Sequence, residues 1–309
     1  MNKQDPFLRF GVASDLHVTD WASAESFRKA LRWFRDQDVD AVVIPGDLTD
    51  HGLLPQLENV VRSWQEVFPG DRAPDGHHVE RLFIYGNHDF EGLAYRDKWM
   101  DANFAVHGLS YEEADGLQLR KIGLDKVWER FFGEPYAPIW RKRVKGFDFI
   151  GGHSAWNAPE GLTEWFAANG ASLNPDRPFF YIQHPHPKGT VFGDAVTNGC
   201  DDGTSTRVLS AYPNAVAITG HSHVPLELEG AVWRGAFTSI AASSMSYGFW
   251  PGAPEKTERS RAGVLGMKGG APFAQAMLVE VNGDRLCISG FDVNQGKSTR
   301  SVFSVKAKE

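Results

Sequence analysis

The stretch LFIYGNHD, residues 82–89, joins a short apolar run to a polar tetrapeptide. A run of this length, rich in β-branched and aromatic residues, is typical of a buried strand. GNHD is then expected at the carboxyl end of that strand. In open α/β sheets the loops at the carboxyl ends of the strands converge on one crevice, where ligands bind. The stretch therefore predicts an α/β fold with a polar site at this edge of a sheet.

Four other polar segments follow runs of the same kind, so they are expected at the same edge. They are Asp15-Leu16-His17, Gly46-Asp47, Gln183-His184 and Gly220-His221-Ser222-His223. Oxygen and imidazole ligands of these types suit Mn, Fe or Zn better than metals that prefer thiolates. Two such ions about 3.5–4 Å apart can neutralise a phosphate and activate a bridging water. The predicted function is a binuclear metal-dependent phosphoesterase, in which the bridging hydroxide attacks the phosphate ester in line.

Strand and helix patterns alternate along the first 90 residues, which favours βαβ units and a mostly parallel sheet. Strands are expected over residues 7–14, 40–45 and 81–85, with helices over 24–36 and 54–67. Further strands are expected over 139–150 (two strands that turn near Gly146), 178–183, 215–219, 232–242, 275–281, 285–293 and 302–305, with a helix over 161–168.

No repeat, linker or low-complexity tract divides the chain, so residues 1–309 are predicted to form a single domain. Residues 90–132 are expected to be a helical insertion that caps the crevice, and the part from about residue 215 is expected to be rich in strands. Residues 188–207 form a long, polar, glycine-rich segment. Loops of that length are usually functional or disordered, so this one is a candidate substrate-binding loop.

The composition is that of a soluble globular protein, with 42% hydrophobic and 23% charged residues. The net charge of −7 and the absence of a basic stripe argue against nucleic acid as a partner. No apolar run reaches the roughly 18 residues of a membrane helix. The amino terminus carries no apolar signal segment. A cytoplasmic location is expected for the chain as given, although an exported protein whose signal has been removed would have the same sequence.

The ordered series of these five polar segments, over residues 7–245, resembles the calcineurin-like metallophosphoesterase superfamily. This resemblance implies a four-layer α/β/β/α sandwich of two mixed sheets flanked by helices. It also implies two divalent or trivalent transition-metal ions (Mn, Fe or Zn). By the same resemblance, Asp15, His17 and His223 would hold the first ion, Asp47 would bridge, and Asn87, His184 and His221 would hold the second.

The resemblance also implies a catalytic role for His88, which would stabilise or protonate the leaving oxygen. General acid catalysis of this kind contributes about 10²–10⁴-fold. A carboxylate should orient such a histidine through its other nitrogen, and the candidates are Asp50 and Asp89. The spacing found in phosphoprotein phosphatases favours Asp50. His186 is an alternative to His184 as ligand, but His184 directly ends its strand.

Residues 46–52 (GDLTDHG) look most like those of bacterial phosphodiesterases of the cyclic-nucleotide and glycerophosphodiester type. A small phosphodiester is therefore the expected substrate, recognised by residues 90–132, 188–207 and 238–247. The alternatives are a phosphomonoesterase, a non-catalytic scaffold of the same fold and a DNA repair nuclease. The complete ligand set argues against the scaffold, and the acidic pI of about 5.9 argues against the nuclease.

Overall fold

Two six-stranded sheets form the centre of the protein, which we describe from a computed structural model covering residues 8–97, 109–191, 199–248 and 273–306. The first sheet has the order β12-β11-β10-β1-β2-β3. Its strands are β1 (Leu8–Val12), β2 (Ala41–Pro45), β3 (Glu80–Ile84), β10 (Gln275–Asn282), β11 (Arg285–Asp292) and β12 (Lys297–Lys306). The neighbours β1, β2 and β3 are parallel, whereas β10, β11 and β12 pair antiparallel. The sheet is therefore mixed.

The second sheet has the order β4-β5-β6-β7-β9-β8. Its strands are β4 (Ile139–Val144), β5 (Phe147–Gly152), β6 (Phe179–Gln183), β7 (Ala215–Thr219), β8 (Val232–Arg234) and β9 (Thr238–Ala241). Its central strands β5, β6, β7 and β9 are parallel, while β4 and β8 pair antiparallel at the two edges. The two predicted strands within residues 139–150 thus form a hairpin that turns at Gly146.

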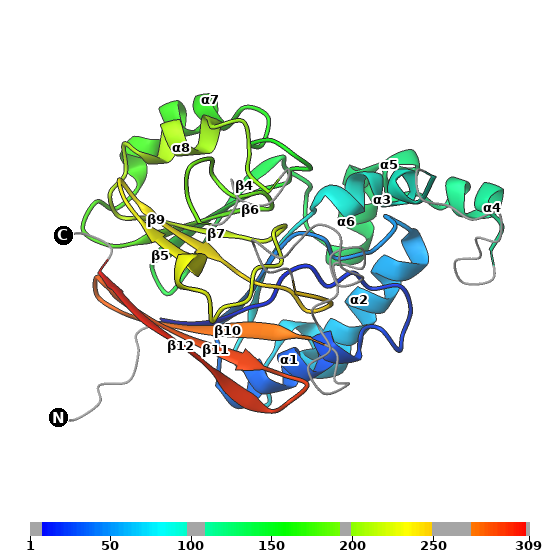
Figure 1. Cartoon of the computed structure of the whole chain (residues 1–309). Helices are drawn as coiled ribbons and strands as arrows, with labels where there is room; N and C mark the ends of the chain where they lie inside the picture. Colours follow the sequence, from blue (N-terminus) through cyan, green and yellow to red (C-terminus); the bar gives the residue numbers. More distant parts are fainter. Residues whose placement is uncertain (1–7, 98–108, 192–198, 249–272, 307–309) are drawn as a thin grey trace, which may run out of the picture.

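Helices cover the outer faces of both sheets (Figure 1). On the first sheet they are α1 (Glu25–Asp36), α2 (Leu54–Val67), α5 (Leu119–Ile122) and α6 (Leu124–Phe132), and on the second they are α7 (Leu162–Asn169) and α8 (Thr204–Leu209). The other described helices are α3 (Asn87–Asp97) and α4 (Tyr111–Gly116), and α4 lies away from the sheets (Figure 1). Short 3₁₀ turns lie at Pro69–Asp71, Gly170–Ser172 and Glu229–Ala231.

Three buried clusters lie between the successive layers. In the first, Phe27 and Leu57 of α1 and α2 pack on the outer face of the first sheet. In the second, Phe10 meets Phe149 and Phe180 between the sheets, with ring centroids 5.3 and 4.8 Å apart. The third cluster joins α7 and α8 to the second sheet. The four-layer α/β/β/α sandwich is confirmed.

The first layer follows from helical spacing in the sequence. Phe27, Leu31 and Phe34 recur along α1 and are fully buried, as the period of an amphipathic helix requires. Phe34 sits so close to Gly11 of β1 that a Cβ at Gly11 would lie 2.5 Å from its ring. A side chain at this position would push the helix off the sheet. β2 is buried along its whole length, as a central parallel strand should be.

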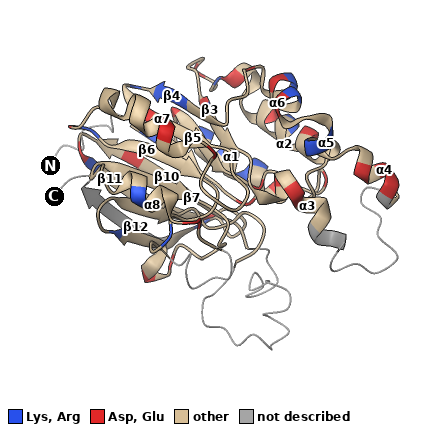
Figure 2. Cartoon of the chain, turned by 90° about the horizontal axis from the view of Figure 1, so that it is seen from above, with Lys and Arg blue, Asp and Glu red and all other residues tan. Residues whose placement is uncertain are grey.

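The segments predicted to roof the crevice are described in part, because residues 98–108 and 192–198 lie outside the described ranges. Leu119, Val127 and Trp128 of α5 and α6 pack into the cluster beneath the first sheet. The capping role of residues 90–132 stays a prediction. In Figure 2 acidic residues gather on α4, whereas the charged residues of α5 are basic and α6 carries both signs of charge. None of the described helices combines the length and apolar character that crossing a bilayer requires.

Candidate metal centre

All five predicted polar segments lie at carboxyl ends of parallel strands. The first sheet supplies the segments after β1, β2 and β3, and the second supplies those after β6 and β7. The resulting site is built from Asp15, His17, Asp47, Asn87, His184, His221 and His223, which the structure brings together across the two sheets. Each sheet alone would present only part of this set.

Four of these side chains form a first group around one point. Asp15 Oδ1 lies 3.0 Å from His223 Nε2. His17 Nε2 lies 3.2 Å from the same nitrogen and 3.7 Å from Asp47 Oδ2. The ligand atoms of all four lie within 4.8 Å of one another, and all four residues are buried. Two imidazoles and two carboxylates form a donor set that suits Mn, Fe or Zn.

Asp47 also belongs to a second group. Its Oδ2 lies 3.1 Å from His184 Nε2, which lies 3.2 Å from His221 Nδ1 and 2.8 Å from Asn87 Oδ1. The carboxylate oxygen that faces the first group therefore faces the second as well. A shared carboxylate of this kind holds two ions at the short separation that binuclear hydrolysis requires.

The histidine rings are held so that a nitrogen lone pair faces each group. In three of them the Nδ1 atom has another partner, namely the Asp50 carboxylate for His17 (3.0 Å), the Pro45 carbonyl for His184 (2.7 Å) and the Tyr247 carbonyl for His223 (3.0 Å). An imidazole that donates its Nδ1–H to such a partner presents Nε2 as a metal ligand. The residues therefore fit two transition-metal ions.

Five of the ligand positions have left-handed backbone conformations, which are uncommon outside glycine. They are Asp15 (φ 52°), His17 (φ 44°), Asp47 (φ 51°), His221 (φ 68°) and His223 (φ 54°). Such conformations cost on the order of 1–3 kcal/mol each and persist where the surroundings fix them. At Gly86 a Cβ would clash with the Asp47 carboxylate. The loops after the strands are thus shaped by close contacts around the ligands.

Burial and neighbouring charges oppose each other at the carboxylates. Burial acts to raise the pKa of Asp15, but the adjacent His223 has the opposite effect, and the resulting pKa is about 2. At Asp47 burial also raises the pKa, and His184 with His88 holds it well below its ordinary value. Both carboxylates are therefore ionised near neutral pH. At His184 burial lowers the pKa, but the Asp47 and Asp15 carboxylates raise it to about 9. A bound cation would take the place of that proton.

His88 lies beside the first group and is held by the main chain. Its Nδ1 lies 2.8 Å from the carbonyl oxygen of Asp50 and 3.7 Å from the Asp50 carboxylate. Its backbone N–H donates to Asp47 Oδ1 over 2.8 Å. The Asp50 carboxylate lies closer to His17 Nδ1, at 3.0 Å. Asp50 thus contacts both histidines, one mainly through its carbonyl and the other through its carboxylate.

Asp89, the other candidate partner of His88, has a different environment. Its buried carboxylate accepts hydrogen bonds from the backbone of Gly86 (2.9 Å), Leu48 (3.0 Å) and Thr49 (2.9 Å), and from the Thr49 hydroxyl (2.7 Å). Burial and the nearby Asp47 raise the pKa of Asp89 to about 6. This carboxylate ties the loop after β2 to the loop after β3. It therefore positions the segments that carry Asp47 and Asn87.

Two further histidines at strand ends are buried outside the groups. His186, the alternative to His184, faces the Ser222 hydroxyl through Nε2 (2.6 Å) and the Thr219 hydroxyl through Nδ1. His153 accepts a hydrogen bond from the backbone of Tyr85 over 2.9 Å. Burial lowers the pKa of both imidazoles to about 3. Both are neutral hydrogen-bonding residues of the fold.

Sequence reasoning did not assign a role to the aromatic residues around the site. The ring of Tyr247 lies 4.0 Å from that of His223, and the ring of Trp156 lies 5.3 Å from that of His221. Trp156 also donates its indole N–H to Glu91 over 3.3 Å. Tyr247 ends the run of small hydroxyl residues behind GHSH, which was the only signal for it in the sequence.

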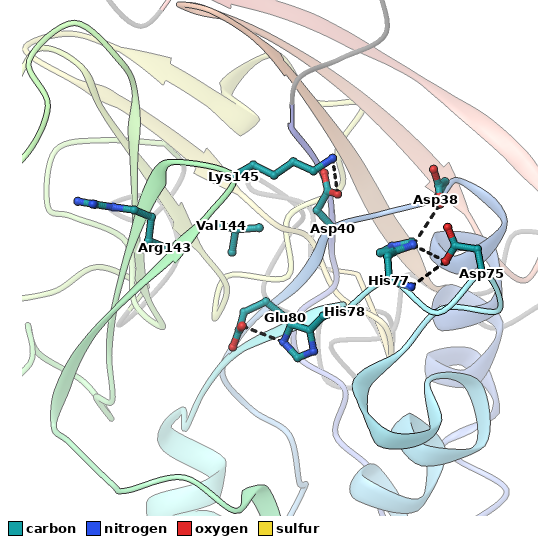
Figure 3. A pocket seen from close by; sticks show the side chains of 9 residues that line it. All are labelled: Asp38, Asp40, Asp75, His77, His78, Glu80, Arg143, Val144 and Lys145. Carbon is teal, nitrogen blue, oxygen red and sulfur yellow. Dashed lines mark hydrogen bonds and ion pairs between the residues drawn. The ribbon is translucent and has the colours of Figure 1, made fainter.

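A separate hollow of about 460 Å³ opens at the amino ends of β2 and β3 (Figure 3). Three of its acidic residues contact basic side chains of the same hollow: Asp40 contacts Lys145 (2.8 Å), Glu80 contacts His78 (3.0 Å) and Asp75 contacts His77 (2.6 Å). Asp38, Asp75 and His77 are close enough to hold an ion. However, His77 Nε2 also donates to the Val39 carbonyl (3.0 Å). A histidine engaged at both nitrogens has no lone pair to offer a metal.

The His77 contacts predict a pH-dependent contribution to stability. Burial acts to lower the pKa of His77, but the Val39 carbonyl and the Asp75 carboxylate raise it above its ordinary value. The stabilisation is therefore fully present below the unfolded pKa of about 6.5 and lost as pH rises through the folded pKa. It should not exceed about 1 kcal/mol, because the pair is largely exposed. Urea unfolding of the wild type and His77→Gln across this range should show a difference confined to low pH. A constant difference would contradict this ion pair.

Comparison with known proteins places the chain by sequence. A model of the calcineurin-like phosphoesterase family matches residues 8–225, which include every predicted ligand. No curated protein sequence matches the chain.

Solved structures of several kinds resemble the fold. One is a dimetal phosphatase from Danio rerio, with 14% identity, a TM-score of 0.57 and coverage of 98% of this chain and 100% of that one. GAP50, the anchor in the inner membrane complex of Plasmodium, has 11% identity, a TM-score of 0.46 and coverages of 97% and 88%. Zinc-bound Vps29 from Entamoeba histolytica has 13% identity, a TM-score of 0.43 and coverages of 97% and 100%. At 14% identity, the likeness to the first supports the fold alone.

Proposed function

The chain belongs to the calcineurin-like phosphoesterase family, and from this membership we propose that it hydrolyses a small phosphodiester with two bound transition-metal ions. The observation that carries the proposal is the Asp47 carboxylate, whose Oδ2 lies 3.7 Å from His17 Nε2 in one group and 3.1 Å from His184 Nε2 in the other. A pair of neighbouring cations would account for the many buried ligand atoms around this one carboxylate.

Each residue has a defined part in this proposal. Asp15, His17 and His223 would hold one ion, Asn87, His184 and His221 the other, and Asp47 would contact both. When bound, such ions neutralise the phosphate and lower the pKa of a water between them. The Asp50 carbonyl fixes the Nδ1 side of His88. His88 would hold a proton for the leaving oxygen.

A diester is favoured over a monoester by the residues beside the bridge. Residues 46–52 resemble those of bacterial phosphodiesterases, and His51 follows Asp50 where phosphoprotein phosphatases carry a phosphate-gripping arginine. A diester carries one negative charge and a monoester up to two, so the diester depends less on such an arginine. The metals we propose are Mn, Fe or Zn, which suit this mixture of imidazole and oxygen ligands.

The test compares bis(p-nitrophenyl) phosphate with p-nitrophenyl phosphate after reloading the apo-protein with Mn²⁺. We expect faster release of p-nitrophenol from the diester, and a lower rate in the His88→Ala variant. Preference for the monoester would overturn the diester assignment and indicate a phosphatase. Absence of turnover on both substrates, with two ions bound, would contradict the enzyme proposal and favour a binding scaffold.

A further inference from the structure

Residues 243–247 form a short segment that is anchored to the loop after β1. The hydroxyls of Ser244 and Ser246 donate to the Asp15 carbonyl over 3.3 and 3.1 Å. The backbone N–H of Met245 donates to the Ser14 carbonyl over 2.9 Å. This segment lies beyond residues 8–225, which the family model matches. It is nevertheless bonded directly to the loop that carries two candidate ligands.

Tyr247, at the end of this segment, contacts the first metal group through both its backbone and its ring. Its carbonyl accepts from His223 Nδ1 over 3.0 Å, and its ring lies 4.0 Å from the His223 ring and 5.4 Å from the His17 ring. The ring of His88 lies 4.4 Å from that same His17 ring. Tyr247 and His88 therefore both pack on His17, a member of the first metal group.

The hydroxyl of Tyr247 is a neutral group near pH 7, as tyrosine hydroxyls ordinarily are. No described residue exchanges a hydrogen bond with this hydroxyl, and the residue is only half-buried. Because its ring packs on His223 and His17, this phenol is a neutral donor beside the candidate ligands. Such a donor can stabilise an anion without contributing a charge of its own.

We propose that the Tyr247 hydroxyl donates a hydrogen bond to a non-bridging oxygen of the substrate phosphate at the first metal group. This rests on the proposed function and adds a substrate-contacting residue to it. A bound phosphate would supply the acceptor that the hydroxyl lacks among the described residues. The anchoring by Ser244 and Ser246 holds the donor in place before substrate arrives, as preorganised stabilisation requires.

The test is the Tyr247→Phe variant, which keeps the ring packing and the backbone carbonyl and removes only the hydroxyl. A hydrogen bond to a charged acceptor is worth about a 10- to 100-fold change. We expect kcat/KM for bis(p-nitrophenyl) phosphate to fall by about that factor, and the inhibition constant of inorganic phosphate to rise. Mn²⁺ content and thermal stability should match the wild type. Tyr212→Phe is the control, because Tyr212 packs on Phe166 and Phe179 in an outer layer.

The outcomes separate this inference from the proposed function. If the wild type is active and Tyr247→Phe stays within about twofold of it in both readouts, the hydroxyl does not contact the phosphate. An equal loss of activity and Mn²⁺ in Tyr247→Phe would make the residue a support for His223 instead, and would also overturn the proposal. If the wild type neither turns over substrate nor binds phosphate, both the proposed function and this contact are contradicted.

Discussion

Replacing Asp47 by asparagine is expected to remove both metal ions and to lower phosphoesterase activity more than any other single change at the site. The Oδ2 atom of Asp47 faces His17 and His184, one from each group. The amide keeps the size of the carboxylate but not its charge, so the variant would lack the anion that faces both groups. Loss of a residue that merely supports a ligand costs about 10–100-fold in affinity, and the loss here should exceed that.

The Asp47→Asn protein should still fold. In the wild type the surrounding imidazoles stabilise the negative charge of Asp47, whereas the nearby Asp15 carboxylate repels that charge. Metal content after dialysis against Mn²⁺, with circular dichroism to verify folding, measures the effect. The matched control is Asp75→Asn, which alters the separate cluster at the amino ends of the strands. Two ions retained by Asp47→Asn, or ions lost from Asp75→Asn, would contradict the assignment of the metal centre.

The sandwich could be predicted because its strands are short, apolar and separated by clear helical periods. The expected strand over residues 215–219 and the helix over 54–67 match β7 and α2 at both ends. α8 was not predicted, because its sequence, TSTRVL, is short, polar and preceded by a glycine-rich segment. The order of strands in each sheet was also not predicted. It depends on contacts between distant segments, such as the pairing of β10 with β1.

The candidate ligands could be predicted for a related reason. Each lies within a few residues of a strand end, so parallel strands bring them to one edge without further information. The contacts that hold these ligands and His88 in place could not be predicted in this way. The sequence indicated Asp50 as partner of His88 by its carboxylate, whereas its carbonyl is the nearer group, at 2.8 Å against 3.7 Å. Which atom of a residue faces a neighbour depends on loop conformation, and sequence spacing does not specify it.

Replacing His88 by alanine is expected to lower kcat by about 10²–10⁴-fold while leaving both ions bound. The prediction follows from its position beside Asp50, outside the two groups that share Asp47. An acid matters most when the leaving alcohol is a poor one. The rate of the variant should therefore depend more steeply on leaving-group acidity than that of the wild type, which a series of substituted aryl diesters can measure. Equal dependence in both proteins would show that His88 does not protonate the leaving oxygen.

Asp50→Asn separates the two roles that this residue combines. The variant keeps the backbone carbonyl that accepts from His88 Nδ1, so kcat at saturating Mn²⁺ should fall much less than in His88→Ala. It loses the negative charge beside His17 Nδ1, and affinity for Mn²⁺ should weaken by about 10–100-fold as the basicity of that ligand decreases. A loss of kcat equal to that of His88→Ala, with both ions bound, would assign the orientation of His88 to the carboxylate. The contact at 2.8 Å predicts that the carbonyl carries it, because a neutral acceptor at that distance is enough to fix the tautomer of the imidazole.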